Sequence, residues 1–293
     1  MFEKIVVATD LSPASDRLIS CLQGLRPFGA REAILVHALG IRHLEAMKYE
    51  LARLAEPRLA EQKVQLEAHG FKTDTKIAVG PPPLEVDRVA KAEGASLVVV
   101  GSHGGTLAFE MPLGSCAHAL IHHATLPTLV IRMRMIDKDT PGRCDALCID
   151  LSRRILFPTD FSDNAERAFA YVGKMAEAGV HQITILHVQD KERIEPHLRD
   201  RLEEFNAIDR ARLDRLATSL RSRANVTVEL EIAYGSPIQE IVNRANEQAD
   251  TMIVMGSQGR GRIPETFLGS ISHQVVRLAE VPVLLVPAVA PTP

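Results

Sequence analysis

The chain has 293 residues, of which 46% are hydrophobic and 24% are charged, and its formal charge is −3. This length is about twice the roughly 150 residues of a typical domain, and the apolar fraction excludes wholesale disorder. The balanced charge and the low aromatic content, 4% with no Trp, disfavour a broad surface for nucleic acid or anionic lipid. The sequence contains no secretory leader pattern and no apolar run near the roughly 20 residues that span a bilayer. We therefore expect a cytoplasmic protein that has neither nucleic acid nor membrane as a partner.

In the first half of the chain, short runs of Val, Ile and Leu alternate with longer stretches of helical composition. Ser12 followed by Pro13 predicts a helix N-cap and first turn. This alternating order is typical of a parallel sheet with right-handed crossovers and helices on both faces. The expected strands are 4–9, 33–38, 73–79, 96–101 and 128–132, and the expected helices are 13–27, 43–69, 83–93 and 114–124.

The second half repeats the first. Ile5 to Asp10 reads IVVATD and Ile155 to Asp160 reads ILFPTD, at an offset of 150 residues. Ser162 before Asp163 is the equivalent N-cap. The charged stretch 191–223 is interpreted as the solvated face of one long helix. The expected strands of this half are 154–158, 182–188, 226–232, 251–256 and 282–286.

Between the halves, residues 135–152 break the pattern and contain Pro141-Gly142, which is typical of a linker. We therefore predict two tandem domains, 1–134 and 153–288, joined by a linker at 135–152. Each domain is expected to be α/β, with a doubly wound five-stranded parallel sheet in the strand order 3-2-1-4-5. Residues 288–293 are expected to form a loose tail.

Such a sheet binds ligands beyond the carboxyl ends of its strands, where the strand order reverses. In the order 3-2-1-4-5 that crevice lies between strands one and four. Strand one ends at Asp10 in the first copy and Asp160 in the second, and strand four ends at Gly101 and Gly256. The two most unusual local sequences of each copy are therefore expected to meet at one crevice.

Each copy carries the pattern G-x2-G-x9-G-S after its fourth strand, and 7 of the 15 aligned positions in 101–115 and 256–270 are identical. Glycine allows tight bends, and successive N–H groups in such a loop bind anions. The final Gly-Ser opens a helix whose N-terminus favours phosphate. The alternative is that these glycines only close turns, which their retention in both copies disfavours. The pattern lacks the lysine of a Walker A loop and differs from the GxGxxG fingerprint.

The glycine pattern, the strand-one Asp and the HV-type second strand resemble the universal stress protein family, over nearly the whole chain, as in tandem members. The pattern is typical of its ATP-binding branch, whose fold is Rossmann-like and adenine nucleotide alpha hydrolase-like. The resemblance implies two universal stress protein domains that bind ATP, ADP or AMP, with or without Mg. It places Asp160 and the Val188 backbone at the adenine and ribose end, and Met255 and Gly256 beside the nucleoside. The implied residues are Asp160, Val188, Met255, Gly256, Gly259, Arg260, Gly269, Ser270, Ile271 and Ser272, and in the first copy Asp10, Ala38, Val100, Gly101, Gly104, Gly114 and Ser115.

The two copies differ at their expected phosphate ends. The second has Ser272 where the first has Ala117, so the first lacks one hydroxyl. The second also carries Arg260 and Arg262, whose guanidinium groups can reach phosphate oxygens. We therefore expect tighter ATP binding in the second copy, with the first weak, occupied by a smaller nucleotide, or empty.

Three functions remain open from the sequence. The first is an adenine-nucleotide-binding stress-response protein that acts as a regulatory or signalling module. The second is a slow ATP hydrolase or phosphotransferase, for which Asp160 or Asp10, with Glu265 or Glu110, are the candidate carboxylates. The third is a non-binding dimeric scaffold. No assembled catalytic constellation is visible, so we assign no catalytic residue.

The remaining polar candidates favour structural roles. His118 and His122 have the i,i+4 spacing of a metal clamp, but partly exposed residues near the C-terminus of a helix are the better interpretation, and we assign no metal site. His37 and His187 follow apolar strand-two residues and are expected to be packed, hydrogen-bonded imidazoles. Cys144 and Cys148 can form a redox or metal pair, which a reducing cytosol disfavours.

Assembly is suggested by the fifth strands, 128–131 and 283–286, which are apolar edges that an isolated domain would expose. The family resemblance implies that these strands pair, here between the two copies as a pseudo-dimer. A homodimer of the whole chain is the further expectation.

Overall fold

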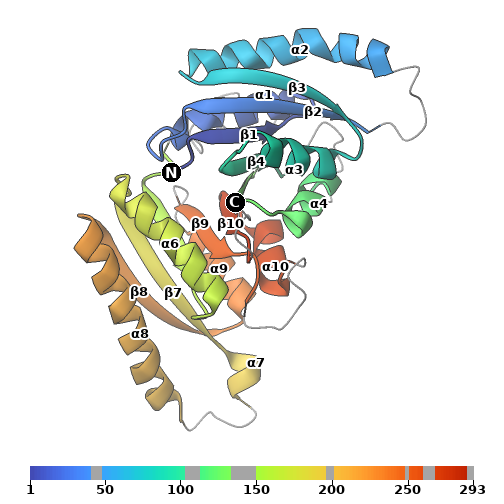
Figure 1. The fold of residues 1–293 in the computed structure, drawn as a ribbon. Coiled ribbons are helices and arrows are strands. Elements are labelled where there is room, and N and C mark those ends of the chain that lie inside the picture. The colour runs from blue at the N-terminus through green and yellow to red at the C-terminus, as the bar shows by residue number, and fades with distance from the viewer. Residues whose placement is uncertain are drawn as a thin grey trace. The chain divides into compact units, whose positions relative to one another are not determined.

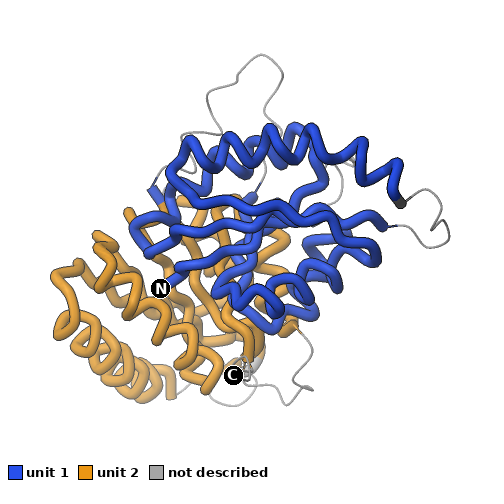
Figure 2. Tube along the Cα trace, turned by 45° about the horizontal axis from the view of Figure 1, so that its top comes forward, with its two compact units in different colours: residues 1–150, 289–293 blue, residues 151–288 orange. Residues whose placement is uncertain are grey.

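The structure is a computed structural model that describes residues 1–40, 48–102, 113–132, 150–195, 201–247, 251–259 and 268–288. The chain divides into two compact units, residues 1–150 with 289–293 and residues 151–288, coloured separately in Figure 2. Most of the predicted linker, 135–149, lies outside the described residues, and β6 begins soon after it at Arg154.

Unit 1 is a five-stranded parallel sheet between two pairs of helices (Figure 1). The strand order is β3-β2-β1-β4-β5. Helices α1 and α2 contact one another, and α3 contacts α4. The elements are β1 (Lys4–Ala8), α1 (Pro13–Cys21), the 3-10 helix η1 (Leu22–Leu25), β2 (Glu32–Leu39), α2 (Lys48–Ala68), β3 (Lys72–Val79), α3 (Pro82–Ala92), β4 (Leu97–Gly101), α4 (Ser115–His123) and β5 (Thr128–Ile131).

Unit 2 repeats this architecture with the strand order β8-β7-β6-β9-β10, again all parallel. Helices α6 and α8 contact one another, as do α9 and α10 (Figure 1). The elements are β6 (Arg154–Pro158), α6 (Asp163–Glu177), β7 (Gln182–Asp190), α7 (Lys191–Ile194), α8 (Leu202–Arg223), β8 (Thr227–Gly235), α9 (Pro237–Asn246), β9 (Thr251–Gly256), α10 (Ser270–Leu278) and β10 (Val283–Val286). The predicted fold class and the strand order 3-2-1-4-5 are confirmed in each unit.

The central strands form the core because their residues are apolar on both faces. Leu97 to Val100 of β4 are all buried, as expected of a parallel strand covered by helices on both sides. The predicted N-caps are confirmed: the Oγ atoms of Ser12 and Ser162 accept hydrogen bonds from Ser15 N and Ala165 N, each at 3.3 Å.

The prediction of a long helix within 191–223 is confirmed for residues 202–223 and wrong at its start. The structure has two helices there, α7 and α8, and residues 196–200 between them lie outside the described residues. Helix α8 also carries a buried stripe that includes Leu213, Ala217 and Leu220, so it is not solvated all round. The same stripe contains Asp209, which makes an acidic side chain part of the interior of unit 2.

Candidate functional site

A cavity of about 660 Å³ lies in unit 2 at the carboxyl ends of its strands. It is lined by the ends of β6, β7 and β9, by the N-terminal half of α8 and by the first turns of α9 and α10. Every predicted site residue of the second copy that the structure describes contributes to this lining, whereas Arg260 lies outside the described residues. These lining residues are Asp160, Val188, Met255, Gly256, Gly259, Gly269, Ser270, Ile271 and Ser272.

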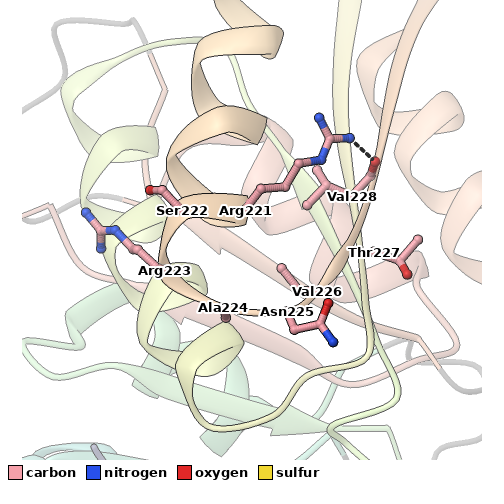
Figure 3. Close-up of a pocket in the computed structure, with 8 residues that line it drawn as sticks. All are labelled: Arg221, Ser222, Arg223, Ala224, Asn225, Val226, Thr227 and Val228. Atoms are coloured by element: carbon pink, nitrogen blue, oxygen red, sulfur yellow. Dashed lines mark hydrogen bonds between the residues drawn. The ribbon is translucent and has the colours of Figure 1, made fainter.

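A second hollow of about 670 Å³ is similar in size but lies at the opposite edge of the sheet (Figure 3). It is formed by residues 221–228, where α8 ends and β8 begins. The guanidinium of Arg221 donates to the carbonyl oxygen of Val228 at 2.8 Å. Its lining includes the side-chain donors of Arg221 and Arg223 but neither a helix N-terminus nor a glycine bend, and the C-terminal carbonyls of a helix repel anions. Size does not distinguish the two hollows, but their position and chemistry do.

The turn after β6 fixes Asp160 at the cavity. Its Oδ1 accepts a hydrogen bond from Ser162 N at 3.0 Å, and Thr159 Oγ1 accepts one from Phe161 N at 3.0 Å. Between them Phe161 has φ +59°, a left-handed conformation that is uncommon for a side chain of this size. A Cβ atom on Gly259 would lie 3.0 Å from Asp160 Oδ2. The carboxylate therefore lies against the glycine bend, as the sequence predicted.

The glycine bend is packed tightly against the protein itself. Ser257 N donates to Val286 O and Gly269 N donates to Ser257 O, both at 2.8 Å. A Cβ on Gly269 would lie 3.2 Å from the Cα of Gln258, and a Cβ on Gly256 would lie 2.9 Å from a backbone oxygen of α6. A side chain at Gly256 would therefore clash with the α6 backbone and one at Gly269 would press on the bend, whereas Gly259 is exposed and close to the Asp160 carboxylate.

Helix α10 begins at the cavity, and the first backbone N–H groups of a helix have no acceptor within it. Its N-cap is Gly269, and within the described residues no side chain caps it. The N–H groups of its first turn carry the positive end of the helix dipole. Ser272 is only 3% exposed, and its hydroxyl donates to Gly256 O at 2.9 Å. Its proton is therefore already used, and a phosphate contact from this hydroxyl requires that the bond be broken.

The other end of the cavity is apolar on several sides. Ile194, Phe205 and Ile208 approach from α7 and α8, and Pro237 and Ile241 from α9. None of these five residues was predicted from the sequence to line a site. The cavity therefore combines backbone donors at one end with hydrocarbon walls at the other.

Four polar side chains on one wall of the cavity and the Phe161 ring packed against them form a cluster, here called the α8 cluster: Phe161, His187, Gln189, Asp209 and Arg212. Asp209 Oδ2 accepts from Gln189 Nε2 at 3.0 Å and lies 3.4 Å from His187 Nε2. The guanidinium of Arg212 lies 3.7 Å from Asp209 Oδ1 and stacks over the Phe161 ring at 5.1 Å. The rings of Phe161 and His187 are 4.6 Å apart. The sequence reasoning missed Asp209 and Gln189; the signal that could have found Asp209 is its position on the helical stripe of Leu213 and Ala217.

Both strand-two histidines are packed and hydrogen-bonded, which confirms the prediction for His37 and His187. His187 Nδ1 lies 2.7 Å from the carbonyl oxygen of Thr159, and His37 Nδ1 lies 3.0 Å from that of Thr9. A carbonyl oxygen only accepts, so Nδ1 carries the proton in each ring. In unit 2 this leaves Nε2 facing Asp209.

Unit 1 reproduces the strand-one turn. Asp10 Oδ1 accepts from Ser15 Oγ at 2.7 Å and from Ser12 N at 3.1 Å, and Leu11 has φ +64°. The bend also closes in the same way, with Gly114 N donating to Ser102 O at 2.7 Å. The remaining first-copy candidates lie where predicted along the chain, Ala38 on β2, Val100 and Gly101 on β4 and Ser115 at the start of α4, whereas Gly104 lies outside the described residues.

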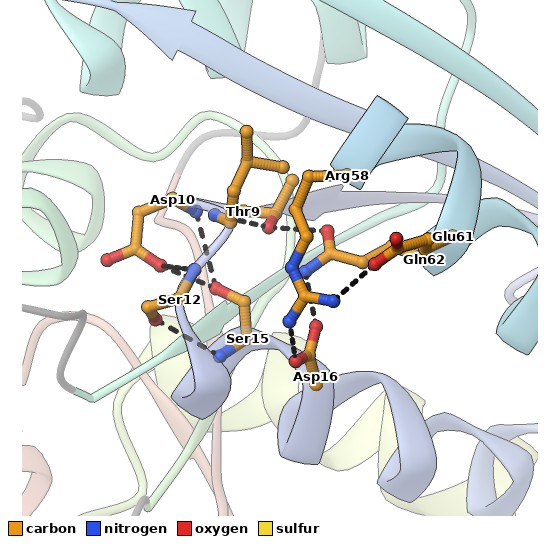
Figure 4. Close-up of polar contacts among 9 residues, drawn as sticks. Thr9, Asp10, Ser12, Ser15, Asp16, Arg58, Glu61 and Gln62 are labelled. Carbon is orange, nitrogen blue, oxygen red and sulfur yellow. Dashed lines mark hydrogen bonds and ion pairs between the residues drawn. The ribbon is translucent and has the colours of Figure 1, made fainter. Parts of the chain in front are cut away.

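The polar contacts that α2 makes in unit 1, shown in Figure 4, differ from those of the α8 cluster. Gln62 is fully buried; it accepts from Thr9 Oγ1 and donates to Asp16 Oδ1, both at 2.8 Å. Arg58 forms an ion pair with the same Asp16 carboxylate. These contacts join helix α2 to helix α1. Within the described residues, the Arg58 guanidinium therefore pairs with a residue of α1 and not with a side chain of β2. The two copies therefore share the turn and the bend but not the side chains around them.

Cys116 stands at the second position of α4, where the second copy has Ile271. Burial, with a smaller contribution from the Asp10 carboxylate, raises the pKa of this thiol from 9.0 to about 11. At pH 8 the thiolate fraction is then about one in a thousand, so Cys116 should react slowly with iodoacetamide in the native protein and faster with each unit of pH. Peptide mapping of labelled protein measures this rate. Equal labelling in native and denatured protein at pH 8 would contradict the prediction.

Within the described residues, no helix combines the length and the apolar character needed to cross a membrane.

Comparisons with known proteins place the chain. The model of the universal stress protein family matches residues 1–132 and 152–287. A universal stress protein of Methanocaldococcus jannaschii is 30% identical over 157 residues, covering 46% of this chain and 97% of its own length. One from Thermus aquaticus is 37% identical over 139 residues, covering 46% of this chain and 98% of its own length. The crystal structure of a universal stress protein from Archaeoglobus fulgidus has the same fold along 98% of this chain and 99% of its own, with a TM-score of 0.73 at 24% identity. Because the family model matches each half separately, the chain belongs to the universal stress protein family as a tandem, two-domain member.

Proposed function

We propose that unit 2 binds an adenine nucleotide, ATP, ADP or AMP, and that the protein is a stress-response regulatory or signalling module that responds to this occupancy. The observation that carries the proposal is the composition of the cavity. One end has the N-terminus of α10 and the glycine bend, the opposite end has apolar walls, and Asp160 lies between them. A nucleotide has the matching order of groups: polyphosphate, ribose and base.

In this arrangement the backbone does most of the binding. The first-turn N–H groups of α10 and the N–H of Gly259 receive the phosphates, with the Ser270 hydroxyl beside them. Asp160 accepts from the ribose hydroxyls, and Val188 and Met255 pack against the nucleoside. Mg, if it accompanies the phosphates, would be held by the phosphate oxygens, because the Asp160 carboxylate is assigned to the ribose hydroxyls.

Nucleotide binding can act as a signal because it stabilises the folded state of unit 2. A ligand that binds only the folded state stabilises it by about 2.7 kcal/mol at a concentration of 100 times Kd. The bend at 256–259 and the start of α10 would gain the most, because they provide the proposed contacts. A partner that recognises the nucleotide-bound bend would then distinguish the loaded protein from the empty one.

The test is to identify what the purified full chain carries. Mass spectrometry of the small molecules released on denaturation should find an adenine nucleotide. After this nucleotide is removed, calorimetry should give heat with ATP, ADP or AMP at one tight site, and the weaker site of the first copy should titrate later or not at all. No released nucleotide and no heat with any of the three would sink the proposal.

Turnover separates this function from the slow hydrolase or phosphotransferase that the sequence also allows. An ATP-cleaving site needs a base and metal-binding carboxylates at the γ-phosphate. In the described part of the cavity, Asp209 is engaged with Gln189 and His187, which leaves Asp160 and Asp190 as the other carboxylates. Binding of Mg-ATP without release of ADP over hours supports the signalling role, whereas product formation that is lost in Asp160→Asn supports the enzyme.

Pairing of the two copies through their fifth strands and a homodimer of the whole chain stay predictions from the sequence. Sedimentation of the full chain with and without ATP measures the second of them.

A further inference from the structure

We propose that Gln189 makes the unit 2 site selective for purines with a 6-amino group over purines with a 6-oxo group, and that Asp209 sets this selectivity by fixing the Gln189 amide. This inference rests on the proposed binding of a purine nucleotide and goes beyond it by naming the residue that selects the base.

Gln189 is placed to contact the base rather than the phosphates. It is the second-last residue of β7, it lines the cavity, and it lies next to Val188 on the strand that ends beside β6. Its side chain is 4% exposed. Ile194, Phe205, Ile208 and Ile241 line the same cavity, so a polar group at this end has few water molecules with which to exchange hydrogen bonds.

The orientation of the Gln189 amide follows from its partner. A carboxylate only accepts hydrogen bonds, so the group 3.0 Å from Asp209 Oδ2 must be the NH₂ of Gln189. The carbonyl oxygen, Oε1, then points the other way as an acceptor. Rotating the amide by 180° would set its oxygen against the carboxylate, which costs a hydrogen bond and adds repulsion.

Asp209 is itself held in place, which makes it a rigid reference for this amide. The guanidinium of Arg212 lies 3.7 Å from its Oδ1. The imidazole of His187 packs 3.4 Å from its Oδ2, and its Nε2 donates to that oxygen when both ring nitrogens carry protons. His187 is in turn anchored by its Nδ1–H to the carbonyl of Thr159, at 2.7 Å. The α8 cluster thus fixes the direction of the amide before any ligand arrives.

A fixed acceptor distinguishes the two purine classes. The 6-amino group of adenine donates a hydrogen bond to such an oxygen, whereas the 6-oxo group of hypoxanthine or guanine presents a second acceptor. Two facing acceptors in a site shielded from water leave both unpaired, and sites that read a hydrogen-bonding group reject analogues that lack it. We therefore expect at least about tenfold weaker binding of ITP than of ATP.

The first copy supplies an internal comparison. Thr9 N donates to Val36 O in unit 1, as Thr159 N donates to Leu186 O in unit 2. This register aligns Leu39 with Gln189. Leucine offers no acceptor, so any nucleotide site in unit 1 lacks this selection.

The experiment measures Kd for ATP and for ITP by calorimetry on the nucleotide-free full chain. The wild type should prefer ATP by about tenfold or more. Gln189→Leu introduces the residue of the first copy. In this variant the Kd values for ATP and ITP should differ by no more than about threefold. Gln182→Leu is the matched control, because it makes the same change at the amino end of the same strand and should keep the wild-type ratio.

Asp209→Asn is the second variant, and it removes the carboxylate that fixes the orientation of the Gln189 amide. An Asn side chain can donate or accept, so the Gln189 amide becomes free to rotate and to donate to a 6-oxo group. The Kd for ITP should therefore approach the Kd for ATP, mainly because ITP binds more tightly. A variant that is merely misfolded would not gain affinity for ITP. This variant also serves as the test if Gln189→Leu does not fold.

The outcomes separate this inference from the function on which it rests. Equal binding of ATP and ITP by the wild type, or an unchanged ratio in both folded variants, overturns the role of Gln189 and leaves nucleotide binding intact. Binding of neither nucleotide by the wild type overturns the proposed function, and this inference with it.

Discussion

Gly259→Ala is expected to weaken ATP binding at the second site by at least about tenfold, or 1.4 kcal/mol, without unfolding the protein. The added Cβ would lie 3.0 Å from Asp160 Oδ2, which is closer than ordinary van der Waals contact. Either the carboxylate or the bend must move, and both line the cavity. Gly259 is exposed and, among the described residues, the added methyl group approaches only Asp160, so the core packing is unchanged. Calorimetry with ATP measures the loss, and thermal unfolding of the nucleotide-free protein checks the fold.

Gly104→Ala is the matched variant, because Gly104 holds the same place in the first copy of the glycine pattern. If the second site is the tighter one, this change should leave the main binding event unaltered. Equal losses of affinity in the two variants would contradict the predicted difference between the copies. An unchanged affinity in Gly259→Ala would show that the Asp160 carboxylate does not need its observed position.

Much of the fold could be predicted because its signals are local. Buried parallel strands such as Leu97–Gly101 are continuous apolar runs, and Ser12 and Ser162 cap their helices through atoms three residues away. The same locality explains the error at 191–223. The Oδ1 of Asp190 accepts from Glu192 N at 3.1 Å and starts a separate short helix, a contact that the uniformly charged sequence hides.

The candidate site divides in the same way. The crevice was predictable because the order of parallel strands brings Asp160 and Gly256 to one edge of the sheet. The α8 cluster was not, because it joins His187 and Gln189 to Asp209, about 20 residues away, across a helix whose register nothing local fixes. The sequence also could not predict why each glycine is needed. The pattern indicates that another group comes close to the glycine backbone, but it does not say whether that group is a phosphate or another part of the protein.

Gly256→Ala is expected to destabilise unit 2 by about 1–3 kcal/mol. Gly256 is buried at the end of β9, and a Cβ there would lie 2.9 Å from the backbone oxygen of Asn164 and 3.0 Å from its carbonyl carbon. Asn164 is in the first turn of α6, whose backbone cannot swing aside as a flexible side chain can. The helix or the strand must shift, and at roughly 2–4 °C per kcal/mol the melting temperature should fall by several degrees. Thermal unfolding of the full chain measures this, and hydrogen exchange of α6 and β9 peptides assigns it to unit 2.

Ser272→Ala is the control for that effect. It removes the hydrogen bond from Ser272 Oγ to Gly256 O without adding an atom near α6, so it should lower the free energy of unfolding by only about 1 kcal/mol.

Adding ATP distinguishes the two reasons for which a glycine can be needed at position 256, packing against α6 and close approach of the ligand. If packing against α6 requires Gly256, the loss of stability appears in the empty protein and ATP restores only what its binding contributes. If ligand approach requires it, the empty variant unfolds like the wild type and the defect appears only when ATP is added. The 2.9 Å contact favours the first result at Gly256, and the exposed position of Gly259 favours the second there.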